Sequence, residues 1–354
     1  MRALVVTPGE ADSTGVAEVA DPRPNAGELL LRTLAVGVCG TDREISEGLF
    51  GVAPDGESRL VLGHEFLGVV ERDGHGFSRG DLVSATVRRS CGRCRPCAEG
   101  SPDACETGDY SERGITRRHG YASELVAESP EHIVPVPPSL RGLGVMAEPA
   151  SICARGIRHA RAIGERQPWG PQRALVIGTG AIGMLSTYFL RLEGFDVWLA
   201  GRSPGGNEKS RLAEACGATY VSTEETPATD LAQGVGGFDL VIEAAGDAQV
   251  MLDSLRLLAR NGVACLLGID GHPRDVSIDG RVLGVDAILQ NRALFGSVNA
   301  HRVDWLAGVE HLDRARARWP DAMEQFVGLR VGLDSFREAF DFRGVKATLA
   351  FADD

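Results

Sequence analysis

A glycine-rich turn at residues 178–183 constrains the fold of this chain more than any other feature. The segment GTGAIG follows an apolar run and precedes a helical pattern. In such a G-x-G-x-x-G turn, Gly178 permits the tight turn, Gly180 lets a pyrophosphate approach the backbone, and Gly183 lets the helix pack on the sheet. We therefore expect a dinucleotide at the helix N-terminus, where backbone N–H groups are free. A simple tight turn is the alternative.

The segments on either side of this turn alternate between strand and helix patterns. Apolar runs typical of strands occupy residues 173–180, 196–202, 238–246, 262–270 and 292–298, and helical patterns occupy 181–194, 208–218 and 248–262. Repeated strand–helix–strand units build a parallel sheet, because each crossover helix returns the chain to the same end of the sheet. The predicted fold class is therefore α/β, with a doubly wound parallel sheet.

The region before residue 138 has a different pattern, in which Gly, Pro and Asp interrupt short β runs. These runs occupy residues 2–7, 28–38, 60–71, 81–87, 121–127 and 133–137. They predict an antiparallel, barrel-like domain. Helical patterns follow at 144–163 and 304–319, and we expect the tail after the second to return to the first domain. Because 354 residues exceed what one core serves, we expect two domains, 1–155 with 300–354, and 156–299.

Four cysteines form a compact run within the first domain. Cys91, Cys94, Cys97 and Cys105 follow one another at intervals of three, three and eight residues, separated by Gly, Pro and polar residues. This spacing lets four thiolates bind one tetrahedral zinc ion, and the closed shell leaves no position for a substrate. We predict a structural zinc lobe at 88–108 that stabilises the fold without taking part in chemistry. Buried or disulfide-bonded cysteines are the alternative.

The formal charge of −12 argues against nucleic acid or an anionic membrane as a partner, because both favour a basic surface. No apolar run approaches the roughly 18 residues of a membrane helix, and the N-terminus has no charged-then-apolar signal segment. The cysteines outside the lobe, Cys39, Cys153, Cys216 and Cys265, lie far apart in the sequence. We therefore expect a cytoplasmic protein with reduced thiols.

The end of the second strand of the α/β region bears on the choice of cofactor. An NAD-specific site has Asp or Glu there, about twenty residues after the glycine turn, to bind the ribose 2′-hydroxyl. This chain has Gly201, Arg202 and Ser203 instead. A guanidinium can pair with a 2′-phosphate, so NADP is favoured, with Ser203 and Asn207 able to add hydrogen bonds. NAD stays possible if Arg202 is only a solvated loop residue.

Three residues elsewhere carry the side chains of a catalytic zinc site. Cys39 lies in GVCGTD, His64 in GHE and Glu148 in AEPA. A thiolate, an imidazole and a carboxylate are competent zinc ligands, and three protein ligands leave one position open for a substrate. Each residue taken alone is more commonly a packed core residue, so the pattern of the whole chain decides.

In their order along the chain, these segments resemble those of the zinc-dependent medium-chain alcohol and polyol dehydrogenases. Within that superfamily the chain is most similar to archaeal-type glucose (aldose) 1-dehydrogenases, through GVCGTDREI at 37–45, YSERGI at 110–115, NGV at 261–263 and GSVN at 296–299. The resemblance covers essentially the whole chain. It implies a Rossmann domain, a GroES-like β-barrel domain bearing the zinc lobe, two zinc ions, a small sugar or polyol substrate, and a homodimer or homotetramer.

The resemblance also implies the ligands of the catalytic zinc. Cys39 and His64 would bind the ion, and Glu65 and Glu148 would lie close enough to bind it directly or through water. Thr41 would hydrogen-bond the reacting hydroxyl and begin a proton path. Hydride would then pass from the sugar carbon to NADP, and an aldose would give a lactone.

Outside the metal site, the resemblance implies that Asp42 braces the zinc ligands and that Glu112 and Asn299 contact sugar hydroxyls. The implied cofactor contacts are Gly178, Gly180, Ala181, Ile182, Gly183, Gly201, Arg202, Ser203, Ala245, Gly268 and Asn299.

Two positions depart from the family pattern. Val87 stands where the sugar dehydrogenases tend to carry Asn, and Ile152 stands where they tend to carry Asp. An unpaired sugar hydroxyl costs about 1–3 kcal/mol. A cyclitol, aminocyclitol or polyol is therefore the alternative substrate, and a non-catalytic NADP-binding redox sensor is the alternative of another class.

Overall fold

The computed structural model describes residues 1–271 and 274–351 and divides into two compact units. Unit 1 comprises Met1–Glu148, Asn299–Val309 and the residues from Glu324 on, and unit 2 comprises Pro149–Val298 and Glu310–Met323. Besides Pro149–Val298, unit 2 includes Glu310–Met323, which contributes side chains to its core. The His311 ring lies 5.0 Å from that of Phe189, for example.

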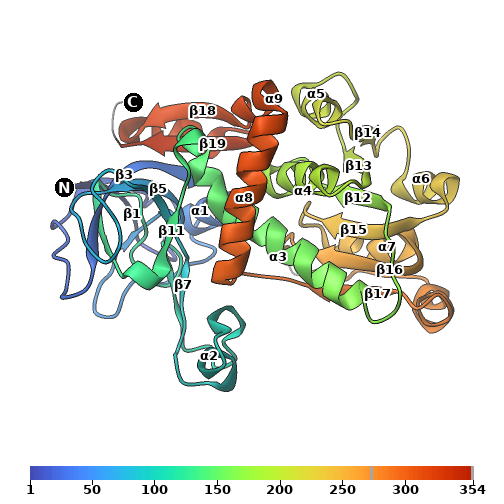
Figure 1. Ribbon diagram of the computed structural model, residues 1–354, viewed down its shortest axis with the longest axis horizontal. Coiled ribbons are helices and arrows are strands. Elements are labelled where there is room, and N and C mark those ends of the chain that lie inside the picture. Colours follow the sequence, from blue (N-terminus) through green and yellow to red (C-terminus); the bar gives the residue numbers. More distant parts are fainter. Residues whose placement is uncertain (272–273, 352–354) are drawn as a thin grey trace. The chain divides into compact units, whose positions relative to one another are not determined.

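Unit 2 is built around a six-stranded parallel sheet (Figure 1). Its strand order is β14–β13–β12–β15–β16–β17, with β12 at Arg173–Ile177, β13 at Asp196–Gly201, β14 at Thr219–Ser222, β15 at Phe238–Glu243, β16 at Leu258–Leu266 and β17 at Ala293–Gly296. The chain starts in the middle of the sheet, builds one half outward and then crosses back to build the other. This confirms the doubly wound α/β prediction. The order reverses between β12 and β15, where sheets of this kind bind ligands at the carboxyl ends of the strands.

Helices precede, connect and follow these strands. They are α3 (Ala147–Gly164), α4 (Ala181–Leu192), α5 (Glu208–Ala215), α6 (Ala228–Val235), α7 (Ala248–Leu257), the π-helical turn Val282–Ala287, α8 (Arg302–Arg318) and α9 (Pro320–Glu324). α3 and α8 each contribute residues to both units. Strand β14 and helix α6 were not predicted, because runs of only four and eight residues are too short for a period to be recognised in the sequence.

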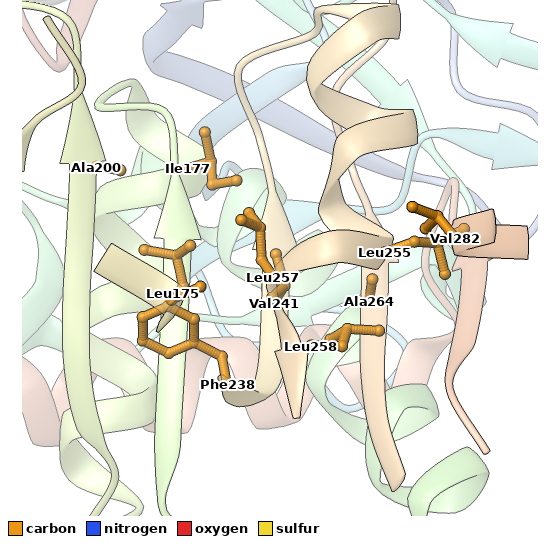
Figure 2. Close-up of a cluster of buried hydrophobic side chains, with 11 residues drawn as sticks. Leu175, Ile177, Ala200, Phe238, Val241, Leu255, Leu257, Leu258, Ala264 and Val282 are labelled. Atoms are coloured by element: carbon orange, nitrogen blue, oxygen red, sulfur yellow. The ribbon is translucent and has the colours of Figure 1, made fainter. Parts of the chain in front are cut away.

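Apolar side chains from both halves of the sheet form the core of unit 2. Figure 2 shows this cluster, in which residues of β12, β13, β15 and β16 meet residues of α7. Phe238 is fully buried, and the Trp198 ring packs edge-on against it with the centroids 5.4 Å apart. The packing of this cluster fixes the end of β12, which the glycine turn follows directly.

The predicted helix over 248–262 is wrong in its second part. α7 ends at Leu257, and Leu258 already has extended backbone angles and pairs with Phe238 as the first residue of β16. Leu258 is 1% exposed, so its apolar side chain is used by the sheet core and not by a helix face. Asn261 then takes a positive φ of 67°, which a continuing helix could not accommodate.

Unit 1 contains a seven-stranded sheet of mainly antiparallel strands. Its order is β11–β6–β5–β3–β19–β18, with β10 also paired to β3. The bounds are β3 Leu29–Val38, β5 Glu65–Val70, β6 Leu82–Ala85, β10 Leu125–Glu128, β11 Ile133–Pro135, β18 Val327–Gly332 and β19 Lys346–Ala350. Only β18 and β19 pair in parallel. Figure 1 shows the C-terminal strands beside β3, so the tail of the chain joins the sheet of unit 1.

Smaller elements complete unit 1. A second sheet joins β1 (Arg2–Val6), β2 (Gly15–Glu18) and β4 (Leu60–Val61), and a third joins β7 (Arg88–Arg89), β8 (Ser111–Arg113) and β9 (Arg117–Arg118). The short helices are α1 (Gly40–Ser46), α2 (Arg95–Ala98), α10 (Phe336–Asp341) and the 3₁₀ turns Pro102–Ala104, Pro130–His132, Pro138–Leu140, Gly144–Met146 and Leu333–Ser335. Among the helices of the described residues, none combines the length and the apolar character that crossing a membrane requires.

Candidate active site

Cys39, His64 and Glu65 converge at one end of the central strands of unit 1. Cys39 follows β3 and precedes α1, and His64 and Glu65 stand at the start of β5. The Cys39 Sγ and His64 Nε2 atoms are 3.1 Å apart, and the possible ligand atoms of all three residues lie within 4.8 Å of one another. A thiolate, an imidazole and a carboxylate at this spacing fit a zinc ion.

Asp42 orients two of these groups. Its Oδ2 accepts a hydrogen bond from the Cys39 backbone N–H at 2.9 Å, and its Oδ1 lies 3.5 Å from His64 Nδ1. A carboxylate on the second ring nitrogen fixes the imidazole so that Nε2 is directed at the metal position. The structure thus places Asp42 in the bracing position that the sequence indicated.

Glu65 has a partner that the sequence did not predict. Lys346 Nζ lies 2.6 Å from both Glu65 carboxylate oxygens, and both side chains are almost fully buried. Strand pairing brings Glu65 and Lys346 together. Glu65 is opposite Gly37 on β3, and Val38, the residue after Gly37, is opposite Ala347 on β19. A Cβ at Gly37 would lie only 2.0 Å from Glu65 Oε2. Glycine at 37 therefore leaves room for this carboxylate.

The electrostatics of this cluster favour a bound cation. Burial alone would lower the pKa of His64, but Cys39 and Asp42 outweigh it and hold the pKa well above its ordinary value. Burial raises the pKa of Glu148 to about 7, and Glu65 adds to the effect while His64 and Lys346 oppose it. A position where negative groups stabilise an extra proton also stabilises a divalent metal ion.

The two remaining predicted residues of this site lie on helices. Thr41 is in the first turn of α1, two residues after Cys39, and is partly buried. Glu148 is in the first turn of α3. It interacts electrostatically with His64, Glu65 and Lys346, but it is not a member of the group whose ligand atoms all lie within 4.8 Å.

The four predicted lobe cysteines form a second cluster. Cys94 Sγ lies 3.3 Å from Cys97 Sγ and 3.9 Å from Cys105 Sγ, and Cys91 Sγ lies 3.9 Å from Cys97 Sγ. All four are free thiols, which excludes the disulfide alternative in this structure. Four sulfur atoms at these distances fit the tetrahedral shell of one zinc ion.

The glycine turn has the geometry that a dinucleotide requires. Gly178 has a φ of 107°, and a Cβ at Gly183 would lie 1.8 Å from the Gly178 carbonyl oxygen. A Cβ at Gly180, in contrast, would meet open space. Gly180 caps α4 without a side-chain hydrogen bond, which leaves the N–H groups of Ala181 and Ile182 for an anion.

The end of β13 carries no acid that would repel a 2′-phosphate. A Cβ at Gly201 would lie 2.6 Å from the Tyr220 hydroxyl, so the chain turns closely there. The Arg202 side chain is exposed. The Ser203 carbonyl accepts a hydrogen bond from Tyr220 at 2.7 Å, and Asn207 caps α5 through Ser210 N. The Asn207 side chain is thus engaged in the cap of α5.

Ala245 and Gly268 lie close to the buried side chain of Glu243. This acid was not identified from the sequence. Glu243 Oε1 accepts hydrogen bonds from the N–H groups of Ala245 and Gly246 at 2.8 and 3.1 Å. A Cβ at Gly268 would lie 2.4 Å from Gly246 N. Burial raises the pKa of Glu243. This carboxylate, at the end of β15, shapes the loop next to the glycine turn.

Known protein families match both parts of the chain. Residues 25–138 match the alcohol dehydrogenase GroES-like domain, and residues 141–351 match the glucose dehydrogenase C-terminus. The chain belongs to the glucose dehydrogenase family of medium-chain zinc dehydrogenases. The GroES-like and Rossmann predictions are thereby confirmed.

Relatives of this dehydrogenase align over nearly its whole length. It is 43% identical to the glucose 1-dehydrogenase of Methanocella arvoryzae, covering 96% of this chain and 95% of that one. It is 40% identical to glucose 1-dehydrogenase 1 of Caldivirga maquilingensis, covering 97% and 96%. A solved structure of Haloferax mediterranei glucose dehydrogenase in complex with NADP, Zn and gluconolactone superposes with a TM-score of 0.92 at 34% identity and covers both chains completely.

The two predicted sugar contacts of this dehydrogenase lie in unit 1. Glu112 is on β8 and forms an ion pair with Arg88, with 2.9 Å between Glu112 Oε1 and Arg88 Nη2. Asn299 takes a left-handed backbone conformation with a φ of 64°, which Asn tolerates better than most residues. Arg88 and Lys346 are the charged partners that sequence reasoning missed. The rarity of lysine could have drawn attention to Lys346, since the chain has only two lysines, Lys209 and Lys346.

Proposed function

We propose that this protein is a zinc-dependent aldose 1-dehydrogenase that oxidises glucose or a closely related sugar with NADP and yields a lactone. The observation that carries the proposal is the convergence of Cys39, His64 and Glu65 in a chain that aligns end to end with glucose 1-dehydrogenases. Gluconolactone and NADP are present in the similar Haloferax structure.

In this proposal Cys39 and His64 bind the catalytic zinc directly. Glu65 and Glu148 are the two candidates for the third ligand. Glu65 is near enough but is held by Lys346 at both oxygens, whereas Glu148 is outside the group of close ligand atoms. Zinc affinities of the Glu65→Gln and Glu148→Gln variants separate them, because only the loss of a ligand weakens binding by a large factor.

Each group in the site has a separate task. Bound zinc supplies Lewis-acid polarisation of the substrate hydroxyl, and bound NADP supplies the hydride acceptor. Thr41 would accept a hydrogen bond from the reacting hydroxyl and, as it takes that proton, pass its own hydroxyl proton on toward solvent. Glu112 and Asn299 hold sugar hydroxyls and so orient the reacting carbon.

NADP binding follows from the glycine turn and the end of β13. The free N–H groups of Ala181 and Ile182 bind the pyrophosphate, and Arg202 pairs with the 2′-phosphate. Gly201, Ser203, Ala245, Gly268 and Asn299 complete the cofactor contacts. Arg202 is exposed, so NAD is also accepted, at lower efficiency.

A substrate panel tests the proposal. Purified zinc-loaded protein is assayed with aldoses, cyclitols, aminocyclitols and acyclic polyols against both cofactors, and reduction is followed by absorbance. Turnover of an aldose with NADP supports the proposal. If cyclitols or polyols are oxidised and no aldose is, the result supports the alternative substrates that Val87 and Ile152 suggest. Binding of NADP with no turnover of any member supports a redox sensor.

We also propose that the protein forms a homodimer through the edge of unit 2, and either stays a dimer or pairs again as a tetramer. β17 is an edge strand of its sheet, and exposed apolar side chains precede and follow it, among them Ile288, Leu289 and Val298. An unpaired strand edge next to apolar side chains suits a second copy of the same strand. Light scattering of the wild type and of Leu289→Glu tests this, since a monomeric wild type contradicts it.

The reduced thiols of Cys39, Cys216, Cys265 and the four lobe cysteines support a reducing compartment. We place the protein in the cytoplasm on that ground.

A further inference from the structure

The side chain that holds Glu112 also contacts the four-cysteine lobe. Arg88 and Glu112 are opposite each other in the β7–β8 pair. The guanidinium Nε and Nη2 atoms both lie 2.9 Å from Glu112 Oε1. The side chains are only 10% and 16% exposed, so water competes little for this charge-assisted pair. Within the described residues, no hydrogen bond reaches the other oxygen, Glu112 Oε2.

The remaining contacts of this guanidinium come from the lobe and from the segment that directly follows it. Arg88 Nη1 donates to the Asp103 carbonyl oxygen at 3.0 Å, and Arg88 Cζ lies 3.9 Å from the centre of the Tyr110 ring. Asp103 belongs to the 3₁₀ turn that Cys105 caps. Tyr110 follows Cys105 by five residues. The positions of both contacts therefore depend on the cluster of four thiolates.

We propose that Arg88 is a positioning residue that couples the structural zinc lobe to substrate selection through Glu112. The guanidinium is fixed by Asp103 of the lobe and by Tyr110 just after it. It in turn fixes Glu112 Oε1, so that Oε2 points in one direction and accepts a hydrogen bond from a sugar hydroxyl. The lobe thus affects specificity although its metal takes no part in the reaction. This inference rests on the proposed function in one respect, namely that Glu112 contacts the substrate.

The first test compares Arg88→Met with a matched control on the same lobe. Arg95 forms an ion pair with Glu99 and is 83% exposed, so Arg95→Met removes a lobe arginine without touching Glu112. Arg88→Met is expected to lower kcat/KM for the aldose about 10- to 100-fold, the value of a charged hydrogen bond, mainly through KM. Arg95→Met should match the wild type, Arg88→Lys should recover part of the loss, and all three variants should retain two zinc ions per chain.

A double-mutant cycle separates positioning from general stability. If Arg88 acts through Glu112, then Arg88→Met should change kcat/KM by less than about twofold in a Glu112→Ala background. An undiminished loss in that background would show that Arg88 supports the fold and not the carboxylate, and would overturn the inference.

Hydrogen exchange provides a readout that does not depend on turnover. In zinc-loaded protein without substrate, the backbone amides of 110–113 should exchange faster in Arg88→Met than in Arg95→Met, because Tyr110 and Glu112 lose their common partner. Equal protection in both variants would overturn the coupling. Faster exchange in a protein that oxidises no aldose would support the coupling and overturn the proposed function instead.

Discussion

Lys346 Nζ lies 2.6 Å from both carboxylate oxygens of Glu65, in a nearly solvent-free position beside the predicted catalytic metal ligands. The two residues are 281 positions apart in sequence and meet only because β19 and β5 flank the same strand, β3. Burial lowers the pKa of Lys346, but Glu65 outweighs this effect and raises it above its ordinary value. Lys346 therefore carries its charge in the folded protein.

Removing the lysine should leave a buried carboxylate without its partner. Lys346→Met is expected to lower the free energy of unfolding by about 3–5 kcal/mol, measured by urea denaturation. Lys209→Met, which removes the only other lysine, should change it by about 0.5 kcal/mol or less. The double variant Lys346→Met/Glu65→Gln should recover much of the loss. Full stability of Lys346→Met alone would mean that the ion pair contributes nothing.

Gly37→Ala should disturb the same carboxylate from the opposite side. The added methyl group would lie 2.0 Å from Glu65 Oε2 and 3.0 Å from its Cβ, so Glu65 must move away from Lys346. The expected cost is about 1–3 kcal/mol of stability, together with weaker catalytic zinc binding measured by competition with a chelator. Gly40→Ala is the matched control, because a Cβ at Gly40 meets open space. Equal effects of the two changes would contradict the packing argument.

Sequence patterns predicted this region only in part. The lobe cysteines have the spacing of zinc ligands within one short run, so their site could be inferred before the fold was known. Cys39 and His64 were identified only through the order of motifs along the whole chain and its resemblance to a known family. Lys346 lies in a short apolar strand with no motif around it, and its role follows only from the pairing of β19 with β3. The helix boundary at Leu257 was mispredicted for a related reason, since Leu258 suits a helix face and a strand equally until its pairing with Phe238 is known.

Arg202→Gln should change the cofactor preference. Without the guanidinium, the ratio of kcat/KM with NADP to that with NAD is expected to fall about 10- to 100-fold, as the loss of one charge-assisted contact to a phosphate predicts. Arg281→Gln removes one positive charge from an exposed site elsewhere in unit 2 and should leave the ratio unchanged. An unchanged ratio in Arg202→Gln would remove Arg202 from the cofactor site.

His132 should make the protein sensitive to acid. Burial, followed by the nearby Arg89, lowers the pKa of His132 to about 3, whereas the unfolded chain binds a proton on histidine below about pH 6.5. Between these values the unfolded state holds more protons, so stability falls as pH decreases, by up to about 1.4 kcal/mol per pH unit for one proton.

The variant His132→Asn tests this pH dependence. Its free energy of unfolding should fall less steeply than that of the wild type from about pH 6.5 down to about pH 4, a window that lies above the lowered pKa. His75→Asn, at an exposed loop histidine, should keep the wild-type slope. Parallel curves for wild type and His132→Asn would exclude the histidine as the cause.

The most direct test of the catalytic site measures NADP reduction by D-glucose and zinc content in the same samples of wild type and Cys39→Ala. The wild type should bind two zinc ions per chain and release a lactone. Cys39→Ala should retain only the ion held by the four lobe cysteines and lose activity at least about 10³-fold, as the loss of several kcal/mol of transition-state stabilisation requires. Full turnover by Cys39→Ala, or no turnover of glucose and other aldoses by the zinc-loaded wild type, would contradict the assignment.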